Sequence, residues 1–562
     1  MERIVATLKK PVSNVGEAAF LLGLFAFLSQ FLGLARDRLL AHTFGAGTEL
    51  DIYYSAFRVP DFIFVTIGSL VAVSVLIPFI ASAKRESREA FELFISDVFT
   101  CFSIAIVFFC ALAFVLMSLI VPKLFPGFSP DELGQIILLS RIILLSPLFL
   151  GLSNLIGSIS QSYGKFVAYA MAPAIYNLGI IFGVIFLTKS LGIAGVAVGV
   201  SFGALLHLLV QMTTLTDIIP FETLCNFRKK ISESFFRIKK VFLVSIPRTL
   251  SLASSNLAVF GLLSIGSVLG AGAISSFTLA NNLQSVIVSI IGISFALAVF
   301  PVLSQLFNSG DNDRMKLEFV NTFRKIIFFT IPAACFIIVF RAHIVRLVLG
   351  SGAFSWEDTR LVAASLAIFA LSLTFQSLYH LFMRALYAMG DNRKSFISSI
   401  SGAVVMVLGA VLWQKYSLIN PLPSEILGAF LKVEDVAGKA MLALPIGFVL
   451  GTIVECTALW VMVNKKIHFT KDIIKVTFHS VGASVIGASS SYVILQYTDS
   501  FFTLNKFVGL LMHATVAGIS GLLIFIATLV LLENEEIYVF LKSFTRKFSG
   551  VKPLAVETDV LS

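Results

Sequence analysis

Long apolar runs divide this chain, and short segments rich in charged residues, glycine or proline separate them. Each run holds about 20 residues, which as an α-helix rising 1.5 Å per residue crosses roughly 30 Å of hydrocarbon. The 562 residues are 57% hydrophobic and only 13% charged. A soluble domain cannot bury that much apolar surface, because its interior grows too slowly with chain length. We therefore predict an all-α integral membrane protein.

Fourteen of the runs have the length of a transmembrane helix. They lie near residues 16–35, 55–82, 96–122, 135–160, 166–187, 191–213, 240–268, 273–305, 322–349, 360–388, 395–414, 439–463, 477–497 and 506–532. The first begins near Ala18 without a convincing small-residue cleavage site, so we interpret it as a helix and not as a signal peptide. An even number of spans predicts both termini on one side.

The distribution of lysine and arginine predicts which side that is. With the N-terminus in the cytoplasm, 27 of the 42 basic residues lie in inner segments, 11 lie outside and four lie within spans. The positive-inside rule therefore predicts that both termini are cytoplasmic. The net charge of +10 is mostly this bias, which favours anionic membrane lipids and not nucleic acid as partners.

Two distant stretches have a similar pattern. "FGAGTELDIYYSAFRVP" precedes a span ending at Pro78, and "LGAGAISSFTLANNLQ", about 223 to 225 residues later, precedes a span ending at Pro301. Repeats of this kind are typical of transporters in which two lobes rock around a substrate. We predict two six-helix lobes, related by a pseudo-twofold around a central cavity, plus two appended helices. The expected units are 1–220 (N-terminal lobe), 221–435 and 436–470 (C-terminal lobe), 471–535 (helices 13 and 14) and 536–562 (a cytoplasmic amphipathic tail).

Charged residues inside apolar spans are the first candidates for function. Such a group costs about 2.5 to 3.5 kcal/mol at the bilayer centre and usually faces a wet cavity or a partner. Asp51 and Arg58 are seven residues apart and share one helix face, and Arg36 ends the preceding helix. A purely structural pairing of Arg58 with Asp51 or Asp61 is the alternative. Arg384 precedes the turn "YAMGDNRK", where helix capping and headgroup contact compete with a substrate role.

Amide side chains add polar groups to the predicted cavity, namely Asn281, Asn282 and Gln284. The predicted cavity combines arginine and amide side chains and lacks a series of Asp and Glu residues inside the membrane. This composition favours binding of an anionic, partly polar substrate over transfer of protons. The sequence contains no metal-ligand spacing, nucleophile elbow or P-loop in a usable context, and its five scattered cysteines indicate no disulfide framework. We expect a transporter and not an enzyme, with no metal and no cofactor.

Four stretches follow one another across helices 1 to 11, namely "GLARDRLLAHTFGAGTELDIYYSAFRVP", "QSYGKFVAYAMAPAIYNLGIIFG", "LGSGAFSWEDTRL" and "RALYAMGDNRKSF". In this order they resemble the MurJ (MviN) family of lipid II flippases. The resemblance implies the fourteen-helix fold of the multidrug/oligosaccharidyl-lipid/polysaccharide (MOP) exporter superfamily, in a bacterial cell membrane. It also implies that lipid II, the undecaprenyl-pyrophosphate-linked peptidoglycan precursor, moves from the inner to the outer leaflet by alternating access.

The resemblance assigns roles to individual residues. Arg36 and Arg58 would attract the pyrophosphate, while Asp51 would hold Arg58 or gate the outer vestibule. The three amides of helix 8 would hydrogen-bond sugar or peptide. We expect a monomer, driven by the membrane potential or by a coupling ion.

Several positions that carry charge in the family are neutral here, including Gln30, residues 63–65, Asn281 and Asn282. These differences leave a flippase for another polyprenyl-linked saccharide as an alternative. A cation-coupled drug exporter similar to the MATE transporters is another, and it would use Asp51 or Asp61 to bind the ion. A membrane transferase would need converging acid and base groups on the outer loops, where "SWEDTR" and "KVEDVAGK" offer carboxylates without a partner.

Overall fold

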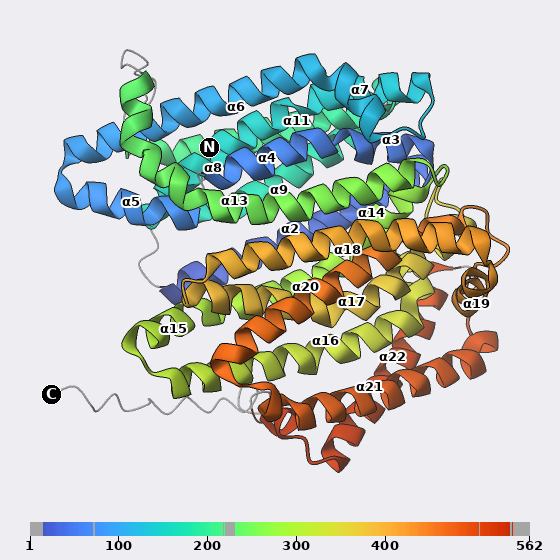
Figure 1. Ribbon diagram of the computed structural model, residues 1–562. Coiled ribbons are helices and arrows are strands. Elements are labelled where there is room, and N and C mark those ends of the chain that lie inside the picture. Colours follow the sequence, from blue (N-terminus) through green and yellow to red (C-terminus); the bar gives the residue numbers. More distant parts are fainter. Residues whose placement is uncertain are drawn as a thin grey trace.

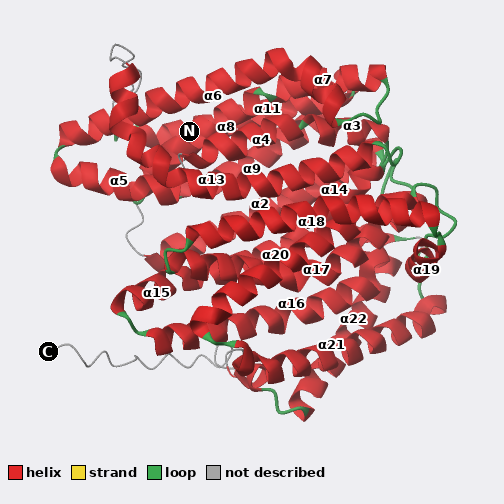
Figure 2. Ribbon diagram, in the orientation of Figure 1, coloured by secondary structure: helices red, strands yellow, loops and turns green. Residues whose placement is uncertain are grey.

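The computed structural model describes residues 15–70, 73–216, 218–219, 231–504, 506–539 and 542. Across these residues the secondary structure is helical, joined by loops and turns, and contains no strand (Figure 2). The prediction of an all-α fold is confirmed.

The helices have the following bounds. In the first part of the chain they are α2 (Val15–Phe44), α3 (Thr48–Ala56), α4 (Arg58–Leu70), α5 (Val73–Glu86), α6 (Arg88–Leu124), α7 (Pro130–Ile143), α8 (Leu145–Ser162), α9 (Val167–Phe182), η1 (Gly183–Leu187), α10 (Thr188–Leu191) and α11 (Ile193–Leu215). In the second part they are α13 (Ile231–Ser267), α14 (Ala273–Ile287), η2 (Val288–Ile293), α15 (Ser294–Ser309), α16 (Asn312–Val348), α17 (Trp356–Ala388), α18 (Asn392–Ile419), α19 (Leu422–Leu431), η3 (Lys439–Leu442), α20 (Ala443–Ile467), α21 (Thr470–Thr498), η4 (Asp499–Phe501) and α22 (Phe507–Leu531).

Where the structure describes them, all fourteen predicted spans coincide with helix. In the described part of the chain, twelve helical stretches are long and apolar enough to cross a membrane. The other two predicted spans, 16–35 and 55–82, correspond to α2 and to the succession of α3, α4 and α5. The chain is therefore a multi-pass membrane protein.

The second predicted span is broken, although its sequence reads as one apolar run. Helix α3 ends at Ala56, Phe57 forms a turn, and α4 begins at Arg58. The corresponding span of the second repeat stays continuous, with the π-helical section η2 between α14 and α15. Both features change the angular position of later side chains around the helix, so a uniform period of 3.6 residues does not predict where those side chains point.

The helices run roughly parallel in an elongated bundle (Figure 1). One group, α3 to α11, fills the upper part of this view, and the other, α14 to α22, fills the lower part. Helix α13 packs against both, since it contacts α4 and α6 on one side and α18 and α20 on the other. We call the end of the bundle with the turn 45–47 the Gly45 end, and the opposite end, with Lys84, the Lys84 end.

The two Gly-Ala-Gly turns of the predicted repeat meet at the Gly45 end. Gly272 has φ +83°, and a Cβ atom there would lie 2.3 Å from the carbonyl oxygen of Ala46. Both the left-handed backbone and the close approach require glycine. The lobe division stays a prediction, and its boundary at 220 falls in 220–230, outside the described residues. The predicted tail helix lies mostly outside them as well.

Candidate functional site

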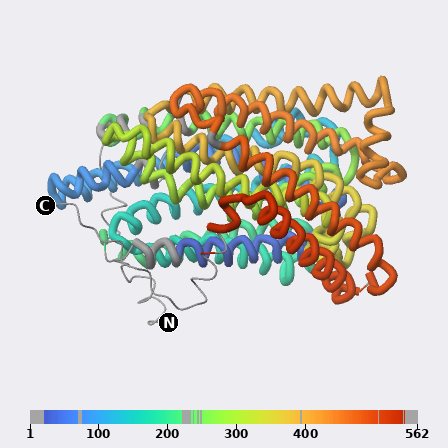
Figure 3. The backbone as a smooth tube through the Cα atoms, turned by 90° about the horizontal axis from the view of Figure 1, so that it is seen from below, coloured from blue at the N-terminus to red at the C-terminus, as the bar shows by residue number. Residues whose placement is uncertain are grey.

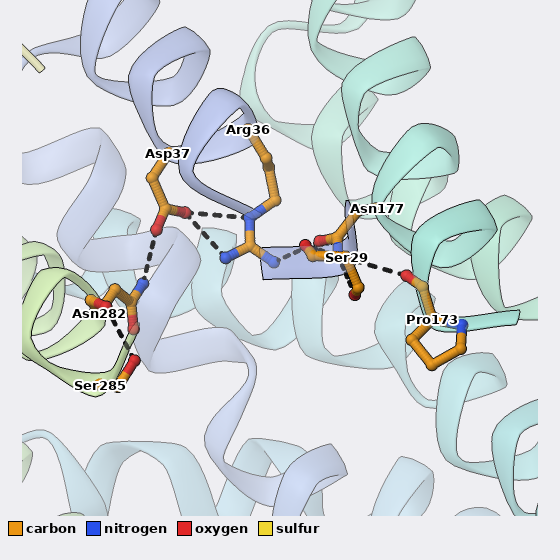
Figure 4. Close-up of polar contacts among 7 residues, drawn as sticks. All are labelled: Ser29, Arg36, Asp37, Pro173, Asn177, Asn282 and Ser285. Carbon is orange, nitrogen blue, oxygen red and sulfur yellow. Dashed lines mark hydrogen bonds and ion pairs between the residues drawn. The ribbon is translucent and has the colours of Figure 1, made fainter. Parts of the chain in front are cut away.

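A charged pair on α2 forms the centre of the candidate site (Figure 4). The Arg36 guanidinium donates from Nε and Nη2 to Oδ1 of Asp37, at 2.9 and 2.8 Å. The Asp37 side chain is only 5% exposed and that of Arg36 23%. Taking two such groups out of water is costly unless their remaining donors and acceptors also find partners.

Amides from two other helices complete this pair. Arg36 Nη1 donates to Oδ1 of Asn177 on α9, at 3.0 Å. Asn282 on α14 donates from Nδ2 to the other carboxylate oxygen of Asp37, at 3.0 Å. Asn177 in turn donates to the hydroxyl and the carbonyl of Ser29, both at 3.3 Å, and is held in place on α2. These bonds link α9, α2 and α14, and so connect the two helix groups (Figure 4).

Arg58 begins α4, directly after the break at Phe57. Its Nε donates to the carbonyl oxygen of Tyr54 at 3.2 Å. Among the described residues, neither of its Nη atoms has a hydrogen bond, and no ion pair joins Arg58 to Asp51 or Asp61. Asp61 still attracts Arg58 electrostatically without a direct bond, so the structural alternative stays open for this pair. In the described structure the two Nη atoms of Arg58 donate to no protein group.

Asp51 binds the other repeat instead of Arg58. Its two carboxylate oxygens accept from the backbone N–H groups of Gly272 and Ser275, at 2.7 and 2.6 Å. The first N–H groups of a helix have no partner within it, and they favour negative charge. Asp51 thus stabilises the N-terminus of α14. The spacing of seven residues predicted one shared face with Arg58, but the break at Phe57 separates the two positions.

The other predicted amides lie on α14, where they contact neighbouring side chains. Gln284 is 1% exposed, and it donates to Oδ1 of Asn281 at 3.0 Å. Gln284 Oε1 also accepts from Gln376 on α17, at 2.9 Å. Gln284 is therefore engaged in helix packing, and of the three predicted amides it is Asn282 that joins the Arg36–Asp37 pair.

Arg384 is separate from this cluster. Its guanidinium lies over the ring of Phe300, 5.4 Å from the centroid, near the Lys84 end of α17. Asp358 lies at the other end of α17. Its carboxylate accepts a hydrogen bond from the backbone N–H of Ala46 in the α2–α3 turn, at 3.3 Å. Arg384 stands 26 positions after Asp358, roughly 39 Å along α17, so it lies at the end of the bundle opposite the α2–α3 turn.

Sequence reasoning missed Asp37, Asn177 and Gln376 as site residues. Asp37 directly follows Arg36, and this adjacent opposite charge was the available signal. Asn177 stands alone in an apolar run, where an isolated amide needs a hydrogen-bond partner. Nothing in the sequence indicates that Gln376 faces Gln284.

Further bonds at the Gly45 end join α2, which packs mainly against α9 of the first helix group, to the second group. Arg38 donates from Nη1 to the carbonyls of Leu347 and Val348 at the end of α16, at 2.7 and 2.9 Å. The backbone N–H of Ala353 donates to the carbonyl of His42 at 2.8 Å. Together with the Asp51 contacts, they hold the two groups together at this end.

The described residues contain no cluster of three or more His, Cys, Asp or Glu side chains that could hold a metal ion. They do form an apolar groove of about 410 Å³ between α14, α16 and α22. Its lining includes Ile287, Phe336, Phe340 and Ala514, and none of the predicted site residues.

Comparison with known families identifies the chain. The family model described as "Lipid II flippase MurJ" matches residues 40–517. The chain belongs to the MurJ family. The match includes Asp51, Arg58 and Asn282, whereas Arg36 and Asp37 lie just before its first residue.

Curated MurJ relatives match about two thirds of the chain. The "Probable lipid II flippase MurJ" of Rickettsia prowazekii is 27% identical over 384 residues, which is 67% of this chain and 74% of the relative. The "Lipid II flippase MurJ" of Burkholderia cenocepacia is 24% identical over 387 residues, 67% of this chain and 74% of the relative.

Solved structures agree with the fold. A lipid II flippase MurJ in an inward closed conformation superposes with a TM-score of 0.72 at 22% identity, covering 92% of this chain and all of that one. An inward-facing multidrug resistance MATE transporter of the MOP superfamily gives 0.61 at 16% identity, covering 79% and 96%. The predicted MOP superfamily fold is confirmed.

Proposed function

We propose that this protein moves lipid II from the inner to the outer leaflet by alternating access. The observation that carries the proposal is the hydrogen-bonded cluster of Arg36, Asp37, Asn177 and Asn282, which joins the two helix groups, together with the free guanidinium nitrogens of Arg58. A pyrophosphate offers several oxygen acceptors, and arginine binds phosphate through paired N–H groups.

Within this proposal the two arginines have different roles. Arg58 would bind the pyrophosphate first, because its Nη atoms donate no hydrogen bond within the described structure. Arg36 is already bonded to Asp37 and Asn177, so the substrate would have to replace Asp37 to reach it. Such an exchange would also release Asp37 from Asn282 and loosen α2 from α14. Substrate binding would in this way favour the change between the two access states.

We further propose that the Gly45 end faces outward and the Lys84 end faces the cytoplasm. The bias of basic residues supports this orientation, because it predicts a cytoplasmic N-terminus and α2, the first described helix, ends at the Gly45 end. Asp51, which stabilises the N-terminus of α14 from the other repeat, would then be an outer gate residue.

The polyprenyl chain of the substrate needs an apolar surface near its pyrophosphate. Helix α14 offers both, since Asn282 faces the cluster and Ile287 lines the apolar groove. Ile287 stands five positions after Asn282, which corresponds to roughly 7.5 Å along the helix. We propose that the groove between α14, α16 and α22 receives the lipid tail.

The proposal describes a transporter and not an enzyme. We propose that a monomer works in contact with anionic lipids, driven by the membrane potential or by a coupling ion, because the sequence contains no ATPase module. Growth rescue tests the function: a bacterium depleted of its own lipid II flippase should survive when this chain is expressed. Lysis despite confirmed expression in the membrane would contradict the proposal.

A flippase for another polyprenyl-linked saccharide is the second candidate. One observation favours it: the polar residues of α14 are uncharged. Asn281 and Gln284 hydrogen-bond to each other, and this helix offers no positive charge to a pyrophosphate. Rescue of a strain that lacks the flippase for a different polyprenyl-linked saccharide, without rescue of the lipid II flippase mutant, would support this second function.

A further inference from the structure

Helix α19 presents an apolar face that no part of the described chain covers. Leu422, Ile426 and Phe430 recur every four residues and are 60%, 68% and 71% exposed. The opposite side faces the protein, where Gly428 and Leu431 are buried. The short helix is therefore amphipathic, but its apolar side points away from the protein core.

The uncovered face continues a surface that already faces lipid. On the transmembrane helix α18, Val404, Leu408, Leu412 and Tyr416 form a stripe at four-residue intervals, and each is at least 50% exposed. The stripe ends at Ile419, which is 83% exposed, and α19 begins three residues later. The same apolar surface thus passes from the membrane-spanning helix onto α19.

Helix α19 lies across the direction of the bundle. Figure 1 shows it end-on at the Gly45 end, and Figure 3 shows the same segment running perpendicular to the long helices. A helix perpendicular to transmembrane helices at their end lies parallel to the membrane surface. This is the orientation of interfacial amphipathic helices.

Exposed aromatic residues lie at the Gly45 end of three long helices. Trp356 is the first residue of α17, Tyr416 lies in the last turn of α18 and Tyr497 in the last turn of α21, and they are 58%, 50% and 78% exposed. Tryptophan and tyrosine concentrate where hydrocarbon meets the headgroups. Helix α19 begins at the end of the bundle that carries these aromatic residues, as expected of an interfacial helix.

The protein side of α19 is fixed by arginine. The carbonyl of Lys432, which follows the helix, accepts from Arg360 Nε at 2.8 Å, and Arg360 also pairs with Asp435. Arg360 lies two residues after Asp358, whose carboxylate accepts from the backbone N–H of Ala46 in the α2–α3 turn. One short path of contacts therefore leads from α19 to the Gly45 end.

We propose that α19 is a lipid anchor. Leu422, Ile426 and Phe430 insert into the leaflet at the Gly45 end, and Arg360 transmits the position of the anchor to the end of α17. The occupant of this face is membrane lipid, because the face is continuous with the α18 stripe and lies at the aromatic boundary. The inference is independent of the transported substrate.

Quenching by brominated lipid tests the proposal in full-length protein, in nanodiscs that hold one copy each. The variant Ile426→Trp places an indole on the apolar face. Its matched control, Glu425→Trp, lies on the next residue, turned about 100° around the helix. The signal of the three native tryptophans is subtracted with the parent chain. Acyl chains brominated near the headgroup should quench the indole at position 426 at least threefold more strongly than the indole at position 425.

Equal quenching at the two positions, or water-like emission from the indole at position 426, would overturn the proposal. Either result would mean that the apolar face of α19 is covered by a second copy or by another protein and not by lipid. Discs that hold one copy leave such a face uncovered, because they exclude self-association. Phe430→Trp repeats the measurement where an aromatic residue already stands, so a folding defect of one variant does not decide the result. Unchanged thermal unfolding of each variant checks the fold.

Discussion

At the level of single residues, the charged pair on α2 stabilises the fold and connects three helices. Arg36 and Asp37 neutralise each other, and each also bonds to an amide on a different helix. Removing one member of a buried pair leaves the other charge without compensation, which costs more than the pair contributes when intact.

The Asp37→Ala variant should therefore be strongly destabilised. We expect a loss of about 3 kcal/mol in unfolding free energy, at the lower end of the range for buried pairs because Arg36 is partly exposed. Thermal unfolding in detergent measures it. The double variant Arg36→Gln, Asp37→Asn should recover much of the loss, and a double variant as unstable as Asp37→Ala would contradict this explanation.

Arg58 should matter for transport and not for stability. Each charge-assisted hydrogen bond contributes about 1.5 to 3 kcal/mol, so Arg58→Gln should reduce substrate transport roughly 10- to 100-fold. Arg58→Lys keeps the charge without the paired N–H geometry, and it should retain an intermediate activity. Both variants should show unchanged abundance and unfolding temperature. Full transport activity in Arg58→Gln would show that the charge has no role.

The sequence indicated which residue types would matter, but not their pairing. Arg36 and Asn282 stand out as polar groups in apolar spans, and they do meet through Asp37. The contact of Asp51 with α14 was not predictable, because it joins positions more than 220 residues apart through backbone N–H groups that any sequence has. Local periodicity carries no information on such a contact.

At the scale of elements, the N-terminus of α14 depends on a carboxylate from the other repeat. Replacing a capping residue costs about 0.5 to 2 kcal/mol. Asp51→Ala should therefore shift the protein toward a state open at the Gly45 end, by roughly 2- to 30-fold.

Thiol labelling measures that shift. Ser276 is fully buried here, so the thiol of a Ser276→Cys variant should react faster with a membrane-impermeant maleimide once Asp51→Ala is added, in a background without the five native cysteines. Gly134→Ala is a suitable control, since no atom lies within 4 Å of the added methyl group. Equal labelling at position 276 with and without Asp51 would show that this contact does not close the Gly45 end.

The Arg360–Asp435 contact beside α19 should persist in mild acid. The hydrogen bond from Arg360 lowers the pKa of Asp435 to about 2. A carboxylate with a lowered pKa stabilises the fold above its unfolded pKa of about 4, and that contribution is lost only as pH falls through about 2. The quenching of the introduced indole in Ile426→Trp should therefore be the same at pH 8 and pH 5. A decrease at pH 5 would mean that another group controls the position of α19.

Helix positions were predictable because apolar length alone defines a membrane span. The break at Phe57 between α3 and α4, inside the predicted span 55–82, was not predictable. A turn at Phe57 and a π-helical section at Val288–Ile293 are set by packing against neighbouring helices, and apolar sequence is compatible with either a regular or an irregular turn.

At the scale of the whole molecule, the proposed orientation can be measured directly. Glu86 lies at the Lys84 end and Lys432 at the Gly45 end, and both are exposed. In intact cells, a membrane-impermeant maleimide should label a cysteine introduced at position 432 and leave one at position 86 unmodified until the membrane is permeabilised. The reverse pattern would invert the assignment of outer and inner ends.

The MOP fold could be predicted from the order of spans, the repeat and the family motifs. The access state of the molecule could not be predicted. The contacts at the Gly45 end, such as those of Arg38 with the last carbonyls of α16, depend on the relative position of the two helix groups. Two access states have the same sequence, so only a structure distinguishes them.

Outward transport by this protein can be followed with labelled lipid II. A bacterium is depleted of its native lipid II flippase, this chain is expressed, and accessible lipid II is quantified at the outer surface. We expect that the parent chain restores outward movement and that Arg58→Gln, at equal abundance in the membrane, does not. Absence of lipid II from the outer leaflet, despite parent chain in the membrane, would contradict the proposed function.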